Sequence, residues 1–102
     1  MDLLFITPAE LVSLLCTRLK QERLVQEWTQ AELARRAGIT VSTLSNLEAG
    51  KNISFETLVK VAMVLGRTNE LTELFQPVLN SIEDIKRLEK AKERQRIKEK
   101  KV

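Results

Sequence analysis

The sequence contains no histidine, only one cysteine and no glycine-rich phosphate-binding loop. Without histidine it lacks the side chain that most often transfers protons in catalysis and that most often binds a metal ion. The single Cys16 can form neither an internal disulfide nor a cysteine cluster, and we expect it to be a small residue of the core. These absences argue against an enzyme, so we name no catalytic residue, and no metal or cofactor is expected.

A run of about 18 apolar residues, which a membrane-spanning helix requires, is also missing. The first eight residues lack the basic start and long apolar segment of a secretory signal. An isolated cysteine suits a reducing compartment, so the sequence predicts a cytoplasmic protein. With 102 residues, the chain has room for one small domain and a tail.

Positive charge is concentrated at one end of the chain. Residues 86–102 hold nine Lys and Arg against three Glu, or +6, which leaves residues 1–85 at −3. The sequence pI near 9.2 therefore describes the tail rather than the whole chain. Apolar residues become sparse after Leu88, and so polar a segment buries little surface on folding. We expect residues 89–102 to be a frayed or disordered helix.

Helix start and stop signals divide the rest of the chain into five predicted helices and show no convincing strand. The expected helices cover residues 8–24, 30–37, 41–49, 55–65 and 69–76. Each is preceded by a Ser or Thr that can cap its first turn, and these are Thr7, Thr29, Thr40, Ser54 and Thr68. The fold class is therefore all-α, with an N-terminal extension at 1–6, a domain at 7–78 and a basic, partly helical or disordered tail at 79–102. Residues 3–6 form the one apolar run that could adopt an extended conformation and pair with a partner chain.

The most informative window is residues 29–50. Thr29 and Glu32 have the spacing of a capping box, and Gly38 lies where positive φ would end the helix. Ala34 is small enough for two helices to cross closely after so short a turn. Five further positions carry apolar residues that would face inward, and these are Leu33, Ala37, Ile39, Leu44 and Leu47. The window thus predicts a helix-turn-helix, which places its second helix in the major groove of DNA.

The segments WTQAELA at 28–34, TLSNLEAGK at 43–51 and LVKVAMVLG at 58–66 resemble the Xre/Cro family of bacterial and phage DNA-binding proteins. This resemblance implies a five-helix, lambda-repressor-like domain and a homodimer that binds a palindromic operator. We expect such a protein to be cytoplasmic and associated with the nucleoid. It also implies an ion pair between Arg23 and Glu48. RTNEL at 67–71, LFQP at 74–77 and the basic tail resemble HipB-like antitoxins, whose partner is a HipA-like kinase toxin.

We divide the predicted DNA contacts into two groups, because phosphate contacts set position and base contacts set sequence. The base-reading residues would be Thr40, Val41, Ser42, Thr43 and Asn46. The phosphate-binding residues would be Gln30, Arg36, Ser45, Lys51 and Asn52. Most of the base-reading side chains are short, which favours close insertion of the helix or readout of DNA shape.

Self-association would use the fifth helix and its flanks, with Leu71, Leu74, Phe75 and Val78 at the interface. In the alternative interpretation, the same residues pack within the monomer and close its core. The tail has three interpretations: a solvated charged helix, a phosphate-binding arm or a toxin-binding segment. The leading function is a transcriptional regulator, acting as an autorepressor. The alternative is a protein-interaction module, toxin-neutralising or multiprotein-bridging, with weak or secondary DNA binding.

Overall fold

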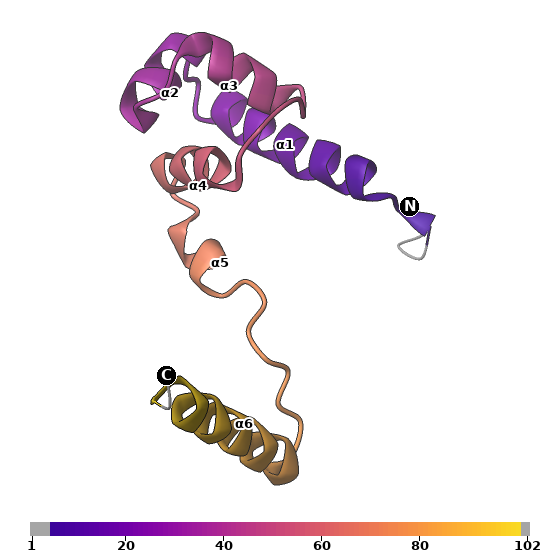
Figure 1. The fold of residues 1–102 in the computed structure, drawn as a ribbon. Coiled ribbons are helices and arrows are strands. Elements are labelled where there is room, and N and C mark those ends of the chain that lie inside the picture. The colour runs from indigo at the N-terminus through magenta and orange to yellow at the C-terminus, as the bar shows by residue number, and fades with distance from the viewer. Residues whose placement is uncertain (1–4, 101–102) are drawn as a thin grey trace.

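A computed structural model describes residues 5–100 of the chain and shows an all-α protein. Within that range the helices are α1 (Pro8–Val25), α2 (Gln30–Ala37), α3 (Val41–Glu48), α4 (Phe55–Val64), α5 (Thr68–Thr72) and α6 (Ile82–Lys100). Figure 1 shows α1 to α4 packed together, α5 following them and α6 standing apart. Of the apolar run predicted at 3–6, Leu3 and Leu4 lie outside the described residues.

The core lies where α2, α3 and α4 meet. Its fully buried large side chains include Leu33 of α2, Leu44 and Leu47 of α3 and Val61 of α4. Leu19, Trp28 and Ile39 are among the partly buried residues packed against them. The inward-facing pattern predicted for the helix-turn-helix window is therefore confirmed, and Ala34 is buried at the close approach. Cys16 is also fully buried, and burial raises the pKa of its thiol, as expected for an unreactive core residue.

Four helices of the domain start on the predicted caps. The hydroxyls of Thr7, Thr29, Thr40 and Ser54 each accept a hydrogen bond from the backbone N–H three residues later. Each bond satisfies one of the free N–H groups in a first turn. The reciprocal half of the predicted capping box is absent, because the Glu32 carboxylate accepts bonds from Arg35 and Arg36 instead.

Helices α1 to α4 end in the same way. After α2, the Gly38 N–H donates to the Arg35 carbonyl and the Ile39 N–H to the Ala34 carbonyl, the paired bonds of a Schellman motif. Gly38, Gly50 and Gly66 hold the left-handed position after α2, α3 and α4, with φ of 70°, 72° and 86°. After α1 the same position is occupied by Glu27, at φ 61°. A non-glycine residue is strained there.

The structure corrects the expectation for the fifth helix. Residues 69–76 were expected to be helical, but α5 ends at Thr72 and the next residues form a turn. Arg67, not Thr68, occupies the N-cap position and provides no side-chain cap. Phe75 adopts a positive φ of 57°, which a helix cannot contain. The helix therefore begins one residue earlier than expected and ends before Phe75, whose backbone conformation a longer helix would not allow.

The tail is also more ordered than its composition suggested, because α6 is one helix that runs to Lys100. Ser81 caps it by accepting from the Asp84 N–H at 3.1 Å. Ion pairs one turn apart, such as Arg87–Asp84 and Arg96–Glu93, support it along its length. Lys, Glu, Arg and Gln have high helix propensity, and the segment contains neither glycine nor proline. For the residues up to 100 the structure shows the helical alternative of this prediction.

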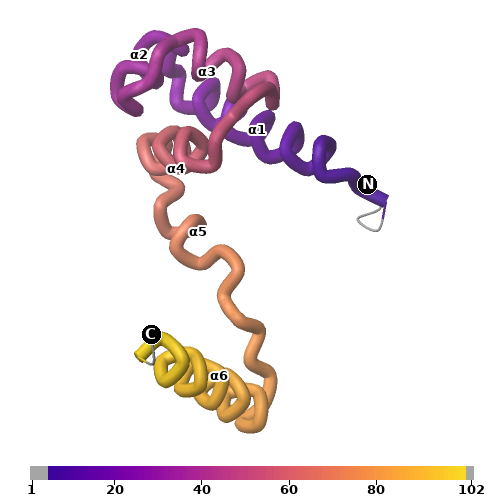
Figure 2. Tube along the Cα trace, in the orientation of Figure 1, coloured from indigo at the N-terminus to yellow at the C-terminus, as the bar shows by residue number. Residues whose placement is uncertain are grey.

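An irregular segment at 73–81, which includes Pro77, carries the chain from α5 to α6 (Figure 2). The Cα radius of gyration is 18.4 Å, whereas a compact domain of this length has about 13 Å. The excess comes from the separation of α6 from the bundle. None of the helices in residues 5–100 combines the length and the apolar character needed to cross a membrane.

Candidate nucleic-acid interface

The helix-turn-helix consists of α2, the three residues 38–40 and α3. Gly38 turns the chain at φ 70°, and an added Cβ there would meet no atom within 4 Å, so backbone conformation alone requires glycine. Thr40 then returns to extended backbone, with φ −77° and ψ 157°, and starts α3. Leu44 and Leu47 fix α3 on the core through one face. The opposite face of α3 is left to solvent.

The start of α3 presents small polar side chains. Thr40, Val41, Ser42, Ser45 and Asn46 are exposed, whereas Thr43 is half-buried. The Thr40 hydroxyl accepts from the Thr43 N–H at 3.0 Å and donates to the Thr43 hydroxyl at 2.8 Å. The predicted base-reading residues therefore lie together on the first two turns of α3. An outer face free of Lys and Arg is compatible with entry into a groove, where base edges offer donors, acceptors and thymine methyl groups.

A buried ion pair holds α3 against α1. The predicted pair is present: Arg23 Nε donates to Glu48 Oε2 at 2.6 Å and the guanidinium makes a second bond to Oε1 at 3.1 Å. The side chains are 8% and 4% exposed. Arg23 also donates to the Trp28 carbonyl at 2.8 Å, so one side chain joins α1, the entry to α2 and the end of α3. Planar two-point pairing of this kind fixes relative orientation as well as distance.

The charge of Glu48 is maintained in this site. Burial by itself would raise the pKa of the carboxyl, but hydrogen bonds from Arg23 and Gln30 and the nearby positive charges of Arg23 and Lys20 outweigh it. The pKa is therefore lowered, and Glu48 remains a carboxylate at neutral pH.

Gln30 is one of the predicted phosphate contacts, and the structure gives it a second partner. Its Nε2 donates to Glu48 Oε1 at 2.8 Å, so the amide at the start of α2 is held by the end of α3. This contact was not anticipated, because it joins residues 18 positions apart through side chains alone. A side chain held in this way needs little reordering to bind a ligand at the N-terminus of α2, where free N–H groups favour phosphate.

Arg36, another predicted phosphate contact, is occupied within the protein. Its Nε donates to Glu32 at 2.8 Å, and its guanidinium lies 4.7 Å from the centre of the Trp28 ring. Arg35 pairs with the same carboxylate at 2.9 Å. Hydrogen bonds from Arg36 and Arg35 lower the pKa of Glu32, which therefore stays charged between them. The two arginines of α2 thus contribute less free positive charge than their number suggests.

The loop after α3 contains the remaining predicted phosphate contacts, Lys51 and Asn52, both exposed. Gly50 and Asn52 have positive φ of 72° and 46°, and asparagine tolerates this conformation better than most residues. A Cβ added at Gly50 would lie 3.5 Å from Ser13 Cα, so this loop approaches α1 closely. The loop is therefore fixed beside the end of α3, in a position adjacent to the reading face.

Two further contacts that the sequence did not reveal hold α1 against the end of α4. Gln26 Nε2 donates to the Leu65 carbonyl at 3.0 Å, and Arg67 pairs with Glu22 at 3.1 Å. The glutamine satisfies a carbonyl at a helix end that lacks an intrahelical partner. Each contact joins residues more than 35 positions apart, and no local sequence signal marks such pairs.

These observations define a helix-turn-helix domain whose second helix offers an exposed polar face for the DNA major groove. A family model described as helix-turn-helix matches residues 19–70, just over half of the chain. The chain belongs to this Xre/Cro-like helix-turn-helix family of DNA-binding proteins. The matched region runs from the end of α1 into α5 and leaves α6 outside. A search of curated proteins gave no match.

Proposed function

We propose that the protein is a sequence-specific transcriptional regulator that binds a palindromic operator as a homodimer and represses its own operon. Family membership supports DNA binding, and the polar first turns of α3 carry the proposal of base reading. In this proposal residues 7–78 are the operator-binding domain and residues 79–102 are a separate tail.

The proposed complex assigns a role to each exposed group near α3. Asn46 bonds adenine through two hydrogen bonds, and Val41 and the Thr43 methyl contact thymine methyl groups. Gln30, Ser45, Lys51 and Asn52 bind phosphates on either side of the groove. Arg36 reaches a phosphate only by giving up part of its contact with Glu32, so we rank it as the weakest of the five.

Base reading is tested by the double variant Ser42→Ala/Asn46→Ala. Duplexes selected by the wild-type protein from random DNA compete with unselected duplexes, and the ratio of the two Kd values measures specificity. We expect the ratio to fall by about one to two orders of magnitude, because each good base contact provides about 1–3 kcal/mol of discrimination. The matched control is Asn69→Ala on α5, which should leave the ratio unchanged. An unchanged ratio in the double variant would refute the proposed reading face.

Dimerisation is supported by the apolar surface of α4 and α5. A hollow of about 410 Å³ is lined mainly by apolar side chains that include Phe55, Met63, Leu71 and Phe75. Phe75 is 90% exposed and has a positive φ, two unfavourable features in a free monomer. Leu74 and Val78 are also exposed, whereas Leu71 is half-buried and lines the hollow. We assign this surface to the second copy of the chain.

Sedimentation of the full chain tests the assignment. Phe75→Ser should convert the dimer to a monomer, because it removes the most exposed aromatic side chain of the surface. Phe5→Ser tests the alternative surface near the N-terminus, where Phe5 is 79% exposed. Val25→Ser, at a 76% exposed apolar residue of α1, is the control and should leave the dimer intact. If Phe5→Ser abolished the dimer and Phe75→Ser did not, the interface would lie at the N-terminal segment instead.

A second candidate function is neutralisation of a kinase-like toxin, as the resemblance to HipB-like antitoxins implies. The specific observation is apolar surface outside the bundle: Val78 and Ile82 are 78% and 72% exposed. Coexpression with the product of an adjacent kinase-like gene tests it. A stable complex that Ile82→Ser disrupts while the dimer remains intact would support this function, and the absence of a complex would refute it.

A further inference from the structure

The bundle has little free positive charge with which to bind DNA. Between residues 8 and 72, eight Lys and Arg stand against seven Glu. Helix α3 has neither Lys nor Arg, and Arg35 and Arg36 of α2 share the Glu32 carboxylate. Attraction to phosphates dominates the affinity of most DNA-binding proteins. The bundle by itself therefore supplies few free cations, and a second source of cations would strengthen the attraction to DNA.

Helix α6 has such a source, because its charges are separated by face. With 3.6 residues per turn, positions 86, 87, 90, 94 and 98 fall within about 120° of arc around the helix axis. All five carry positive charge, and they are Lys86, Arg87, Lys90, Arg94 and Lys98. We call these residues the basic face. Glu83, in the first turn, is the one acidic residue of positions 82–100 in the same sector, where the helix dipole favours it, and Ile97 is the one apolar residue there.

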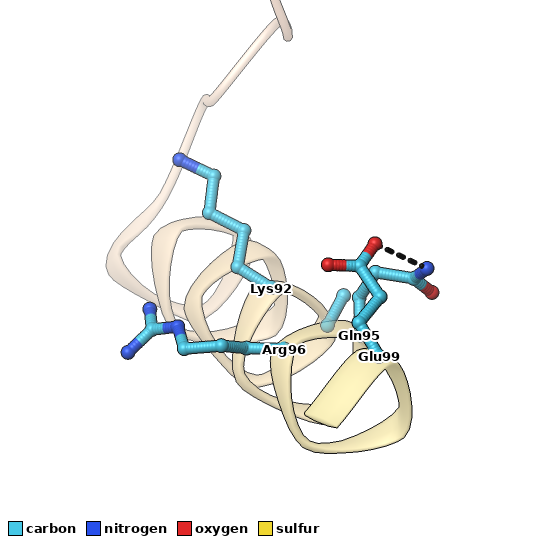
Figure 3. Close-up of a pocket in the computed structure, with 5 residues that line it drawn as sticks. Lys92, Gln95, Arg96 and Glu99 are labelled. Atoms are coloured by element: carbon cyan, nitrogen blue, oxygen red, sulfur yellow. Dashed lines mark hydrogen bonds between the residues drawn. The ribbon is translucent and has the colours of Figure 1, made fainter. Parts of the chain in front are cut away.

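The opposite side of α6 is electrically balanced. Lys92, Arg96 and Lys100 alternate there with Glu89, Glu93 and Glu99. Figure 3 shows part of this side, with Lys92 and Arg96 beside the hydrogen-bonded pair Gln95 and Glu99, joined at 3.0 Å. The shallow surface there is lined by residues of α6 alone and has no opposing wall. Positive and negative side chains that alternate one turn apart stabilise an isolated helix. The basic face has no such alternation, so helix formation does not explain it.

We propose that the basic face of α6 binds the phosphate backbone of DNA beside the site occupied by α3. From Lys86 to Lys98 the face extends about 18 Å, and a duplex of that length carries about ten phosphates. No ion pair is found for Lys90, Arg94 or Lys98 within residues 5–100, so these side chains meet DNA without first breaking an internal contact. The inference rests on the proposed DNA binding by α3 and adds a second contact surface to it.

The linker permits this arrangement. Nine residues, 73–81, separate α5 from α6, and an extended chain of that length reaches up to about 30 Å. In the structure α6 stands clear of the bundle and its residues are largely exposed (Figure 1). It is therefore able to lie along the backbone while the bundle occupies the groove.

Two matched triple variants test the proposal in the full chain. The first, Lys90→Gln/Arg94→Gln/Lys98→Gln, neutralises the basic face. The second, Lys92→Gln/Arg96→Gln/Lys100→Gln, removes the same charges, two Lys and one Arg, from the balanced side. Glutamine is a good helix former, and circular dichroism would show that helix content is unchanged. The probe is a random-sequence 30-base-pair duplex, and its Kd is measured across a series of KCl concentrations.

Each phosphate contact contributes about −0.9 to the slope of log K against log salt. The first triple variant should flatten the slope by about 2.7 per bound protomer, and the second by much less. Equal changes in both variants would show that only overall charge matters, and no change in the first would leave α6 without a role on DNA. Either result would overturn the proposal. Loss of binding to anionic phospholipid vesicles with an unchanged DNA slope would also overturn it, in favour of a membrane surface.

Failure of base reading is distinguishable from failure of this inference. Phosphate contacts carry no sequence information, so the first triple variant should weaken binding to selected and random duplexes by the same factor. Ser42→Ala/Asn46→Ala should instead reduce the ratio between them and leave the salt slope unchanged. A shift in slope for the triple variant together with an unchanged ratio for the double variant would retain the α6 contact and reject base reading by α3.

Discussion

The helix-turn-helix bundle and α6 are both helical, but different forces stabilise them. Helices α2 and α3 have eight residues each and depend on buried leucines and a buried ion pair. Helix α6 has 19 residues, none of them buried, and depends on propensity, a serine cap and ion pairs one turn apart. The comparison shows that a charged sequence can form a helix without a core. Such a sequence does not fix the helix against another element. In the proposed complex the bundle fixes the reading face, whereas α6 supplies positive charge on a helix that has no buried residue.

The largest expected effect is the loss of a core leucine. Leu44→Ala should reduce the free energy of unfolding by about 2–5 kcal/mol, because it leaves a cavity beside Leu33 and Leu47. Ile85→Ala, at a 46% exposed position of α6, should change it by less than about 0.5 kcal/mol. Urea denaturation followed by circular dichroism measures both. Comparable costs at the two sites would mean that α6 has a packed partner.

The buried ion pair gives the next effect. Glu48→Ala should cost about 3 kcal/mol, because Arg23 loses its partner while buried. Removal of the exposed partner Glu93 from Arg96 in α6 should cost less than about 1 kcal/mol. The same denaturation experiment compares Glu48→Ala with Glu93→Ala, and equal values would contradict the difference between the two regions.

The pH dependence follows from the same carboxylate. The folded pKa of Glu48 is lower than its unfolded value near 4.3, so its contribution is complete above that unfolded pKa and is lost as pH falls through the folded one. Glu48→Gln should reduce the steepness of acid unfolding between about pH 5 and 3. Glu22 and Glu32, whose pKa values are also lowered, should leave a residual slope. A curve as steep as that of the wild type would exclude the pair as a source of acid sensitivity.

The smallest effect concerns the end of α1. Glu27→Gly should stabilise the protein by about 0.5–1 kcal/mol, because glycine adopts the left-handed conformation without strain. Gly38→Glu is the reverse change at φ 70°, in a position open enough for a Cβ, and should destabilise by about 1–2 kcal/mol. Melting temperatures of the two variants should move in opposite directions. Movement in the same direction would show that side-chain contacts, rather than φ, determine stability at these positions.

The sequence predicted the features that depend on residues close together in the chain. The caps at Thr29 and Thr40 and the turn at Gly38 are local, since each bond spans five residues or fewer. The Arg23–Glu48 pair was anticipated only through resemblance to a family. The bond from Gln30 to Glu48 was missed, because it depends on how α2 and α3 pack. The fifth helix was predicted too long, because its apolar residues fit a helical pattern and no local sequence signal marked the positive φ of Phe75.

The hydroxyl pair at the start of α3 has a consequence for the choice of base. Thr40 uses its proton on the Thr43 oxygen, so the Thr43 hydroxyl keeps its own proton for an outside acceptor. In the proposed complex Thr43 is then a hydrogen-bond donor, suited to N7 of a purine, O6 of guanine or O4 of thymine. In the proposed complex, the direction of one internal hydrogen bond thus leaves the Thr43 proton free for an acceptor on a base edge.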